Sequence, residues 1–260
     1  LSGGGWRGLA HIGVLKVLEE NNIPIDFIAG TSAGALVGGL YSYFGNSKDL
    51  EEFVLKFGYK DLFKIVADPK LKSGLIKGDR LIRYLNKLTD NANIEDLRIP
   101  FRAVSTDLLT GKTYYFKKGN LAEAIKSSIS IPLVFRPTKQ DSMYLVDGGV
   151  TENVPVKCVK DMGADFVIVS SVNTTIFPVE MEDVNSSRKI AEISARAVLG
   201  TLSEMMSSQA DFVIKPKIPK SKVGIGVNYF LKFVKEKELV KIGQKETEDR
   251  MRSLKYKIKA

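Results

Sequence analysis

The sequence predicts an α/β fold in which helices cover both faces of a mostly parallel sheet. Short apolar runs with the character of strands alternate along the chain with helix-compatible stretches, which is the pattern of such folds. The chain of 260 residues is 44% hydrophobic and 27% charged, which is typical of a globular protein rather than a disordered one. Because this length suffices for one substantial core, we expect a single domain over residues 1–260.

The net charge of +9 lies almost entirely near the C-terminus. Residues 211–260 contain 14 Lys and Arg against 6 Asp and Glu, whereas residues 1–210 contain 25 against 24. Such a basic region either contacts an anionic membrane or forms a solvated, lysine-rich face. The sequence shows no nucleic-acid-binding module, so a nucleic-acid partner is not expected. The single cysteine, Cys158, excludes an internal disulfide framework and a metal site built on thiolates.

The chain starts at Leu1-Ser2, directly before a glycine-rich stretch. We expect a strand to precede this point, so the sequence is uninformative about a signal peptide. The uncharged residues 27–47 are numerous enough to cross a bilayer. They include five glycines and several polar side chains, however, which favours a buried strand, turn and helix. A cytoplasmic or peripheral membrane location is favoured, and the compartment is otherwise open.

The glycine-rich stretch precedes the first predicted helix. It reads Gly3-Gly4-Gly5-Trp6-Arg7-Gly8. Leu9, Ile12 and Leu15 then recur at helical spacing and predict an apolar helix face. The stretch matches the G-x-G-x-x-G pattern of dinucleotide-binding loops, but no acidic residue ends the second strand to hold a ribose. What remains is a loop whose backbone N–H groups bind an anion, either a phosphate or an oxyanion.

Residues 27–34 form the pattern around which the rest of the chain is organised. An apolar run ends at Gly30, Ser32 follows, and Gly34 opens a small-residue helix, so a strand, a tight turn and a helix are predicted. In a G-x-S-x-G turn the glycines lack the Cβ atoms that would collide as the chain reverses. We therefore expect the Ser32 hydroxyl at the tip of the turn, near the positive end of a helix dipole.

Residues 47–66 predict a helical segment with a bulky apolar side that includes Phe53, Phe57 and Phe63. Such a side usually packs on the core or forms a cap over it. The alternative is a lid that faces lipid.

The remaining elements follow from hydrophobic periodicity and turn residues. Helices are predicted where apolar residues recur at helical spacing, and strands where short β-branched and aromatic runs end at turn-forming residues. The helices are expected at residues 79–88, 121–128, 156–162, 190–206 and 236–254. The strands are expected at residues 100–105, with a hairpin partner at 113–116, and at 143–146, 165–170 and 212–214.

Two aspartates and one histidine are candidates for proton transfer. Asp147 follows the predicted strand 143–146 and precedes two glycines, so its carboxylate projects at a strand's carboxyl end, where ligands collect in α/β sheets. Asp107 has a similar position, although a turn-forming role is commoner for such a residue. His11, the only histidine, falls too early for the Ser-Asp-His order of α/β-hydrolases, and a hydrogen bond to a local partner is favoured for it.

Taken together, these motifs resemble those of the patatin-like phospholipases, and of their bacterial branch in particular. The match covers nearly the whole chain, in the family's order. It comprises the glycine loop 3–8 with residues 10–15, Gly30-Thr31-Ser32-Ala33-Gly34, Thr106-Asp107-Leu108, Ser130-Ile131-Pro132, and Asp147-Gly148-Gly149 with Asn153 and Pro155. The resemblance implies a three-layer α/β/α fold and esterase activity on acyl lipids. Trp6 departs from the smaller residues usual in the family, and we expect it to shape the acyl entrance; Leu133 stands where glycine is frequent.

The resemblance also implies the roles of the site residues. Ser32 is the expected nucleophile, Asp147 its base, and the glycine loop 3–8 the oxyanion hole, with Gly30, Gly34, Gly148 and Gly149 supporting the two motifs. No cofactor and no metal are expected. An unperturbed aspartate, with a pKa of about 3.9, is a poor base for an alcohol, so a dry site that raises this pKa is expected.

The sequence therefore predicts a serine acyl hydrolase that cleaves fatty-acyl esters of lipids through an acyl-enzyme, as a phospholipase A, a lysophospholipase or a carboxylesterase. One alternative is an acyltransferase that uses the same serine. The other is a lipid-binding protein without turnover. The expected partner is a phospholipid or another acyl ester, with peripheral contact between the basic residues 211–260 and anionic membrane as a further hypothesis.

Overall fold

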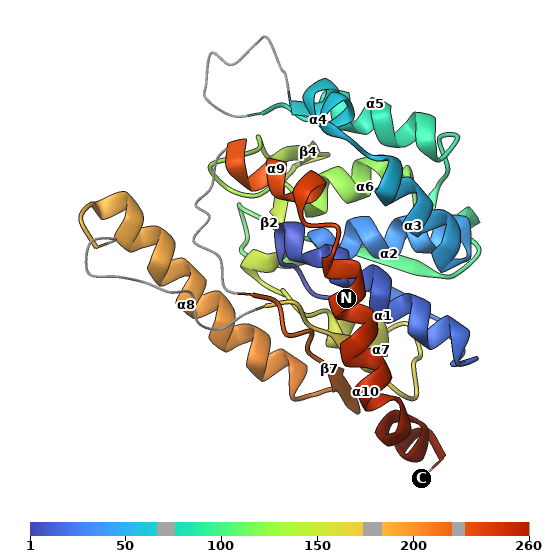
Figure 1. Ribbon diagram of the computed structural model, residues 1–260. Coiled ribbons are helices and arrows are strands. Elements are labelled where there is room, and N and C mark those ends of the chain that lie inside the picture. The colour runs from blue at the N-terminus through green and yellow to red at the C-terminus, as the bar shows by residue number, and fades with distance from the viewer. Residues whose placement is uncertain (67–75, 174–183, 220–226, 260) are drawn as a thin grey trace.

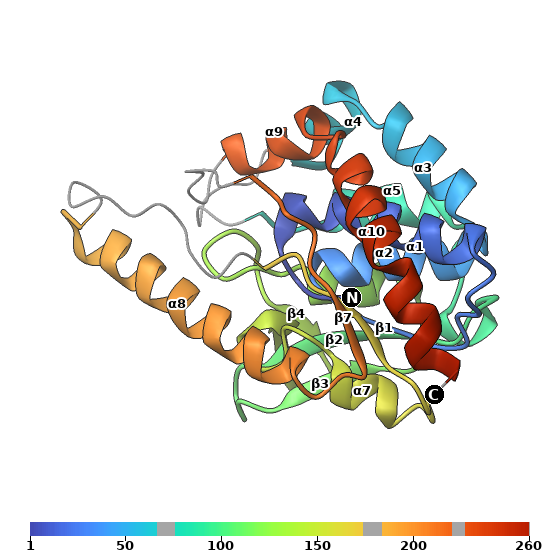
Figure 2. The same cartoon turned by 60° about the horizontal axis from the view of Figure 1, so that its bottom comes forward.

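Helices flank a central β-sheet in the computed structural model of the chain (Figures 1 and 2). The structure describes residues 1–66, 76–173, 184–219 and 227–259. The predicted α/β class, with a sheet between layers of helices, is confirmed. The predicted basic region 211–260 lies partly outside the described residues.

The central sheet has β2 as its hub. β2 (Phe101–Asp107) pairs with β1 (Ile28–Thr31), with β3 (Thr113–Phe116) and with β5 (Met143–Asp147). β4 (Thr138–Gln140), a strand that the sequence did not predict, pairs with β5. β2 thus pairs with β1, which ends just before Ser32, and with β5, which ends at Asp147.

The sheet is mixed rather than mostly parallel. β1 pairs with β2 in parallel, as does β6 (Ile168–Ser170) with β7 (Phe212–Ile214). The ladders that β2 forms with β3 and β5, and that β4 forms with β5, are antiparallel. The reason is local for two of them, because β3 follows β2 and β5 follows β4 across connections that are too short for a parallel crossover.

The first two residues lie between β1 and β6. The Leu1 amino group donates to the carbonyl oxygen of Ala29 (2.8 Å), and the Thr31 N–H donates to that of Leu1 (3.2 Å). The Ser2 N–H donates to the carbonyl oxygen of Ser170 (3.0 Å). These hydrogen bonds join the two-stranded sheet of β6 and β7 to the central one.

The helices mostly lie where the sequence predicts them. They are α1 (Leu9–Glu20), α2 (Ala33–Phe44), α3 (Ser47–Lys56), α4 (Tyr59–Val66), α5 (Asp79–Leu88), α6 (Leu121–Ser128), α7 (Val156–Lys160), α8 (Ser187–Ser207), α9 (Val227–Lys235) and α10 (Leu239–Lys259). The short 3-10 helices are η1 (Gly5–Gly8), η2 (Ile94–Asp96) and η3 (Gly148–Val150).

Two helical regions differ from the prediction. The expected helix 47–66 is split into α3 and α4, because the backbone is extended at Phe57, immediately before Gly58. The helix predicted to start at residue 236 starts at Leu239, and α9 precedes it without having been predicted. The break at Phe57 separates α3, which packs against α1 and α2, from α4, which packs against α5 and α9.

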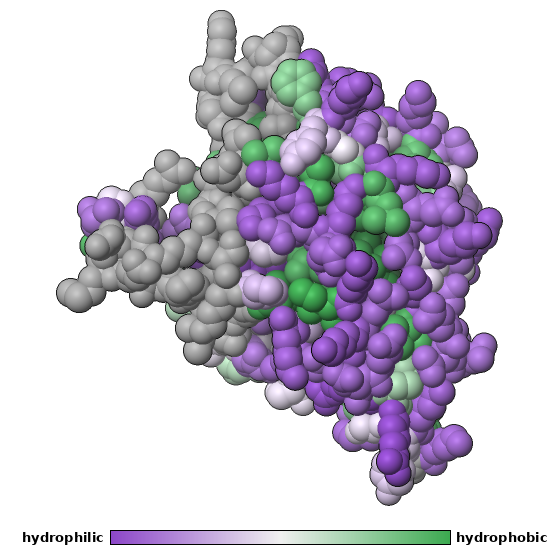
Figure 3. All heavy atoms as spheres, viewed as in Figure 1, coloured by the Kyte–Doolittle hydropathy of each residue, from purple (hydrophilic) through white to green (hydrophobic). Residues whose placement is uncertain are grey.

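The surface is mainly hydrophilic in the view of Figure 3, with separate hydrophobic patches.

Residues 27–47 form β1, α2 and the turns that flank them, as predicted, and most of their side chains are buried. Among the described helices, none combines the length and the apolar character needed to traverse a bilayer.

Candidate active site

Ser32 lies in the tight turn between β1 and α2. Its backbone has φ 54° and ψ −120°, a conformation that residues other than glycine rarely adopt. The turn needs glycine at position 30, because a Cβ there would lie 2.3 Å from the carbonyl oxygen of Gly34. The Ser32 N–H donates to Ser128 Oγ (2.8 Å), which in turn donates to the carbonyl oxygen of Val104 (2.5 Å). The strained turn is thereby anchored to β2 through α6.

The register of the sheet explains why Ser32 meets Asp147, which is 115 positions away in sequence. β3 occupies one edge of β2, opposite residues that also pair with β1 or with β5. β1 and β5 therefore share the other edge of β2. β1 runs parallel to β2 and ends at Thr31, opposite Val104. β5 runs antiparallel to β2 and ends opposite Ser105. The carboxyl ends of the two strands therefore meet head to head.

The side chains of Ser32 and Asp147, which lie at these two strand ends, are hydrogen-bonded to each other. Ser32 Oγ donates to Asp147 Oδ2 at 2.6 Å, and the Gly149 N–H donates to Asp147 Oδ1 at 2.8 Å. A Cβ on Gly148 would lie 2.3 Å from the carbonyl oxygen of Val104, so glycine is needed where the chain leaves β5 beside β2. Both carboxylate oxygens are thus held, and one of them faces the hydroxyl.

Asp147 lies in a dry environment. Its exposed fraction is 6%, as is that of Ser32. Burial raises the pKa of Asp147 from its ordinary value of 3.8 to about 6, although the hydrogen bonds from Ser32 and Gly149 oppose this rise. The carboxylate is accordingly a stronger base than a solvated aspartate, as the sequence led us to expect.

The glycine loop runs beside Ser32. A Cβ on Gly3 would lie 3.2 Å from the Ser32 Cβ, and the Gly3 N–H donates to the carbonyl oxygen of Asn153 (3.0 Å). The N–H groups of Gly4 and Gly5 donate no hydrogen bond to any described residue. Gly5, with φ 60°, starts η1 from a left-handed conformation. Of the predicted oxyanion loop, the N–H groups of Gly4 and Gly5 therefore remain for an anion, whereas that of Gly3 is engaged.

Trp6 and Arg7 of η1 are both buried. The buried Trp6 ring lies 4.5 Å from Arg7 Cζ and 5.1 Å from Lys232 Nζ of α9. A Cβ on Gly8 would lie 2.5 Å from the Ala33 Cβ, so η1 closely approaches the start of α2. Trp6 is not among the described residues that line the cavity beside Ser32. It connects η1 to α9, and the expectation that it shapes an acyl entrance is not supported.

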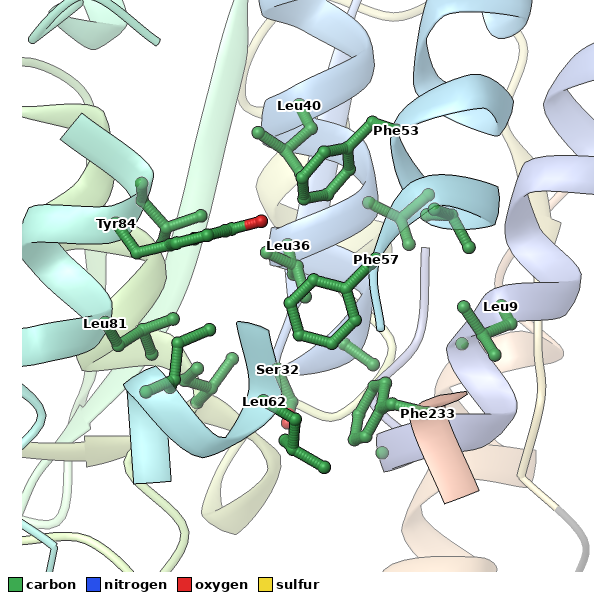
Figure 4. Close-up of a pocket in the computed structure, with 18 of the residues that line it drawn as sticks. Leu9, Ser32, Leu36, Leu40, Phe53, Phe57, Leu62, Leu81, Tyr84 and Phe233 are labelled. Atoms are coloured by element: carbon green, nitrogen blue, oxygen red, sulfur yellow. The ribbon is translucent and has the colours of Figure 1, made fainter. Parts of the chain in front are cut away.

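An apolar cavity extends from Ser32 between α2, α3, α4, α5 and α9 (Figure 4). Ser32, Leu36 and Leu40 recur every four residues and lie along one side of α2, while Phe57 and Tyr84 face them. The described lining residues are Gly5, Gly8, Leu9, Ser32, Ala33, Leu36, Val37, Leu40, Leu50, Phe53, Val54, Phe57, Leu62, Ile65, Leu81, Tyr84, Leu85, Ile129, Ile131, Phe135 and Phe233. Such a lining suits the hydrocarbon chain of an acyl group.

His11 has hydrogen-bond partners other than Ser32 and Asp147. Its Nδ1 lies 2.7 Å from Ser170 Oγ, and its Nε2 lies 2.9 Å from the carbonyl oxygen of Ser2. Burial lowers the pKa of His11 to about 3, so the ring is neutral. The predicted structural role agrees with these contacts, although Ser170 is far away in sequence rather than local.

Asp107 forms the turn that the sequence favoured for it. Its carboxylate accepts hydrogen bonds from Thr110 Oγ1 (2.7 Å), the Tyr144 N–H (3.2 Å) and the Leu109 N–H (3.3 Å). The bond from Thr110, followed by those from the backbone, lowers the pKa of Asp107. The aspartate therefore stays a hydrogen-bond acceptor within the β2–β3 connection.

Sequence reasoning missed the support under the turn and misplaced one aromatic side chain. Ser128 belongs to a correctly predicted helix, but nothing in the spacing of that helix indicates that its hydroxyl holds the Ser32 N–H. Phe53 and Phe57 line the cavity, whereas Phe63, expected to pack with them, is 72% exposed. The glycine after Phe57 is the one local signal that the segment breaks.

Comparison with known proteins indicates the family of the chain. The family model of the patatin-like phospholipases matches residues 1–159, which include all the motifs quoted above. An uncharacterised NTE family protein of Mycobacterium tuberculosis is 35% identical over 174 residues, covering 66% of this chain and 48% of that protein. The lysophospholipase nte1 of Emericella nidulans is 30% identical over 177 residues, covering 67% of this chain and 12% of that protein. The chain thus spans about half the length of its mycobacterial relative.

A solved structure shares the fold. The crystal structure of VipD from Legionella pneumophila matches with a TM-score of 0.61 over 97% of this chain and 66% of that chain, at 14% identity. An identity this low indicates the fold alone. The family model, by contrast, matches well over half of the sequence, and on that ground the chain belongs to the patatin-like phospholipase family.

Proposed function

We propose that this protein is a serine acyl hydrolase that cleaves fatty-acyl esters of lipids. The observation that carries the proposal is the 2.6 Å hydrogen bond between Ser32 Oγ and Asp147 Oδ2 at the end of an apolar cavity. Membership of a phospholipase family and similarity to a relative named as a lysophospholipase support a lipid ester as the substrate.

In the first half of the reaction Ser32 is the nucleophile. Its Oγ attacks the ester carbonyl carbon while its proton passes to Asp147 Oδ2, to which it is already hydrogen-bonded. The carbonyl oxygen becomes an oxyanion, and the N–H groups of Gly4 and Gly5 are the donors for it. The tetrahedral intermediate collapses when the proton on Asp147 passes to the leaving alkoxide oxygen. An acyl-Ser32 ester and a free alcohol, such as a lysolipid or a glycerol phosphodiester, are the products.

In the second half the same groups act on water. Asp147, again ionised, accepts a proton from a water molecule whose oxygen attacks the acyl carbon, and the fatty acid leaves as Ser32 Oγ recovers its proton. A carboxylate replaces the imidazole of a triad here because it contacts the hydroxyl directly. Burial compensates in part for the weaker base, since it brings the pKa of Asp147 to about 6.

Replacement of the nucleophile tests the proposal. Ser32→Ala is expected to lower the hydrolysis of a chromogenic acyl ester by about 10³-fold or more and to abolish labelling by a fluorophosphonate probe. Ser42→Ala is the matched control, because Ser42 is a buried serine of the same α2 helix, remote from the dyad in sequence. Undiminished turnover in Ser32→Ala, with a thermal unfolding transition like that of the wild type, would remove the assignment.

The pH dependence tests the role of Asp147. Because the base must be ionised, kcat/KM should rise as the pH increases through about 6 and then level off. Asp147→Asn should lose this ascending limb together with most of the activity. A rate that is independent of pH between about 5 and 8 contradicts a carboxylate base of raised pKa.

The acceptor of the acyl group separates hydrolysis from transfer. With a hydrolase, the yield of fatty acid stays the same when an alcohol or thiol is added. A new acyl ester or thioester at the expense of fatty acid would favour the acyltransferase. Absence of both turnover and fluorophosphonate labelling of Ser32 would favour a lipid-binding protein.

A further inference from the structure

The outer side of α3 and α4 bears an exposed apolar patch. It consists of Leu55, Tyr59 and Phe63, which are 54%, 54% and 72% exposed. Single exposed apolar residues are ordinary, but three large ones within one short segment mark an interaction surface. Figure 3 shows hydrophobic side chains among hydrophilic ones over the region in which Figure 1 draws α4 and α9. We refer to Leu55, Tyr59 and Phe63 as the α3–α4 patch.

The patch lies on the outside of the cavity wall. Leu62 and Ile65 of α4 are buried and line the cavity, whereas Tyr59 and Phe63, one helical turn apart, face solvent. α4 therefore presents apolar side chains both to the cavity and away from it. A helix of this kind is normally buried on both sides. The outer side of α4 thus fits an apolar partner immediately next to the cavity.

Lysines alternate with the patch residues. Lys56, Lys60 and Lys64 are all exposed, and Lys60 forms no ion pair with any described residue. Glu52 lies 3.1 Å from Lys56 and Asp61 lies 3.5 Å from Lys64, but such exposed pairs are weak. Aromatic and aliphatic side chains rimmed by lysines match the interface of a bilayer, where rings enter the headgroup region and cations meet anionic lipid.

We propose that the α3–α4 patch docks on the surface of a bilayer that contains anionic lipid. Tyr59 and Phe63 enter the headgroup region, and Lys60 and Lys64 lie against the anionic headgroups. This inference rests on the proposed function, because it supposes that the substrate is a lipid. Once docked, α4 is the part of the cavity wall nearest the bilayer, which shortens the path of an acyl chain from the membrane to Ser32.

The basic end of α10 is the competing surface, and its geometry is less suitable. Tyr256 is 76% exposed there among lysines. Lys255 Nζ, however, donates to Asn21 Oδ1 (2.8 Å), and Lys257 Nζ donates to the carbonyl oxygen of Asp211 (2.8 Å), so both lysines hold α10 against the body. The C-terminal end of α10 also lies at the opposite end of the molecule from α4 (Figures 1 and 2). Docking through α10 would leave the cavity distant from the membrane.

Vesicle flotation of the protein in a Ser32→Ala background tests the apolar part of the patch, because the lipid then stays intact. The vesicles consist of phosphatidylcholine with about one-third phosphatidylserine. The double variant Tyr59→Ser, Phe63→Ser is expected to lower the partition coefficient about tenfold or more. Tyr256→Ser, which removes an equally exposed ring from α10, is the matched control and should bind like the parent.

Neutralised lysines test the electrostatic part. Lys60→Gln with Lys64→Gln should weaken binding by up to about fivefold per lysine, only when phosphatidylserine is present, and less so at high salt. Lys245→Gln with Arg252→Gln, two exposed cations of α10 without an ion pair to any described residue, is the matched control. An effect of the α10 pair equal to or larger than that of the α4 pair would overturn the proposal.

An assay with a soluble ester distinguishes an effect on docking from an effect on catalysis. With Ser32 intact, the Tyr59→Ser, Phe63→Ser variant should hydrolyse a short-chain soluble ester at the wild-type rate and vesicle lipid about tenfold more slowly. Wild-type binding of this variant to vesicles, or no binding by the parent, would refute the docking surface. A wild-type protein that binds vesicles through α4 but hydrolyses neither ester would refute the proposed function and leave the docking surface supported.

Discussion

Two helix interfaces in this molecule differ in how closely the backbones approach. α10 lies against α1 with a glycine from each helix at the contact. A Cβ on Gly13 would lie 1.9 Å from the carbonyl oxygen of Val240, and one on Gly243 would lie 2.0 Å from that of Ala10. No side chain fits between the two backbones at this point, so the interface is closed.

The interface of α2 with α3, α4 and α5 is the open counterpart. Aromatic side chains separate these helices, and the rings of Phe53, Phe57 and Tyr84 contact one another at centroid distances of 6.0 to 6.4 Å. Between them and α2 lies the cavity that starts at Ser32 (Figure 4). The candidate site thus adjoins an incompletely filled interface, whereas α1 and α10 form a fully packed one.

Truncation of a large side chain should lower the free energy of unfolding more at the closed interface than at the open one. Leu254 of α10 is fully buried against α1 and β7. Leu254→Ala is expected to lower the free energy of unfolding by about 3 kcal/mol, because the truncation leaves a cavity in a closed interface. Phe57→Ala removes more atoms but should cost only about 1 kcal/mol, since this ring already borders empty space. Urea unfolding measures both values. Equal losses would mean that the cavity is filled in solution.

A methyl group added to the closed interface of α1 and α10 tests how tightly the two backbones pack. Gly243→Ala places a Cβ against the backbone of α1, and we expect a net loss of about 2 kcal/mol even though alanine favours a helix. Ser253→Ala, on the exposed side of α10, is the control and should change the free energy of unfolding by less than about 0.5 kcal/mol. A stabilised Gly243→Ala variant would show that the two helices move apart easily.

The ionised form of Asp147, at the polar end of the cavity, should lower the free energy of unfolding because its charge is buried. Because burial raises the pKa of Asp147 above its unfolded value, the folded state binds this proton more tightly, and the cost of the buried charge appears as the pH rises from about 4 to above about 6. Asp147→Asn should therefore gain about 3 kcal/mol at pH 8, for a rise of about two pKa units, and little at pH 4. Thermal unfolding at both pH values checks this, with Asp26→Asn, an exposed aspartate, as the control. A gain at pH 4 as large as that at pH 8 would exclude a charge effect.

Local features of the sequence predicted the elements around the site better than their mutual arrangement. Gly30 and Gly34 indicated the turn at Ser32 because the restriction they relieve lies within a few residues. The hairpin of β2 and β3 was equally evident from its turn. The direction of β5 was not, because pairing between strands that are distant in sequence depends on which edge of β2 remains available. The exposed side chain of Phe63 was missed for a similar reason, since which side of α4 is buried depends on the elements that pack against it.

The sequence by itself determined the strand, turn and helix around Ser32, the glycine loop after Leu1-Ser2, and the glycines behind Asp147, because each depends on backbone freedom at neighbouring positions. Its resemblance to a family pointed to Asp147 as the partner of Ser32, which spacing alone did not. Only the tertiary structure decided how the two meet. β1 and β5 reach the same edge of β2 from opposite directions, and their ends leave a hydroxyl and a carboxylate in contact beside a cavity that several helices enclose.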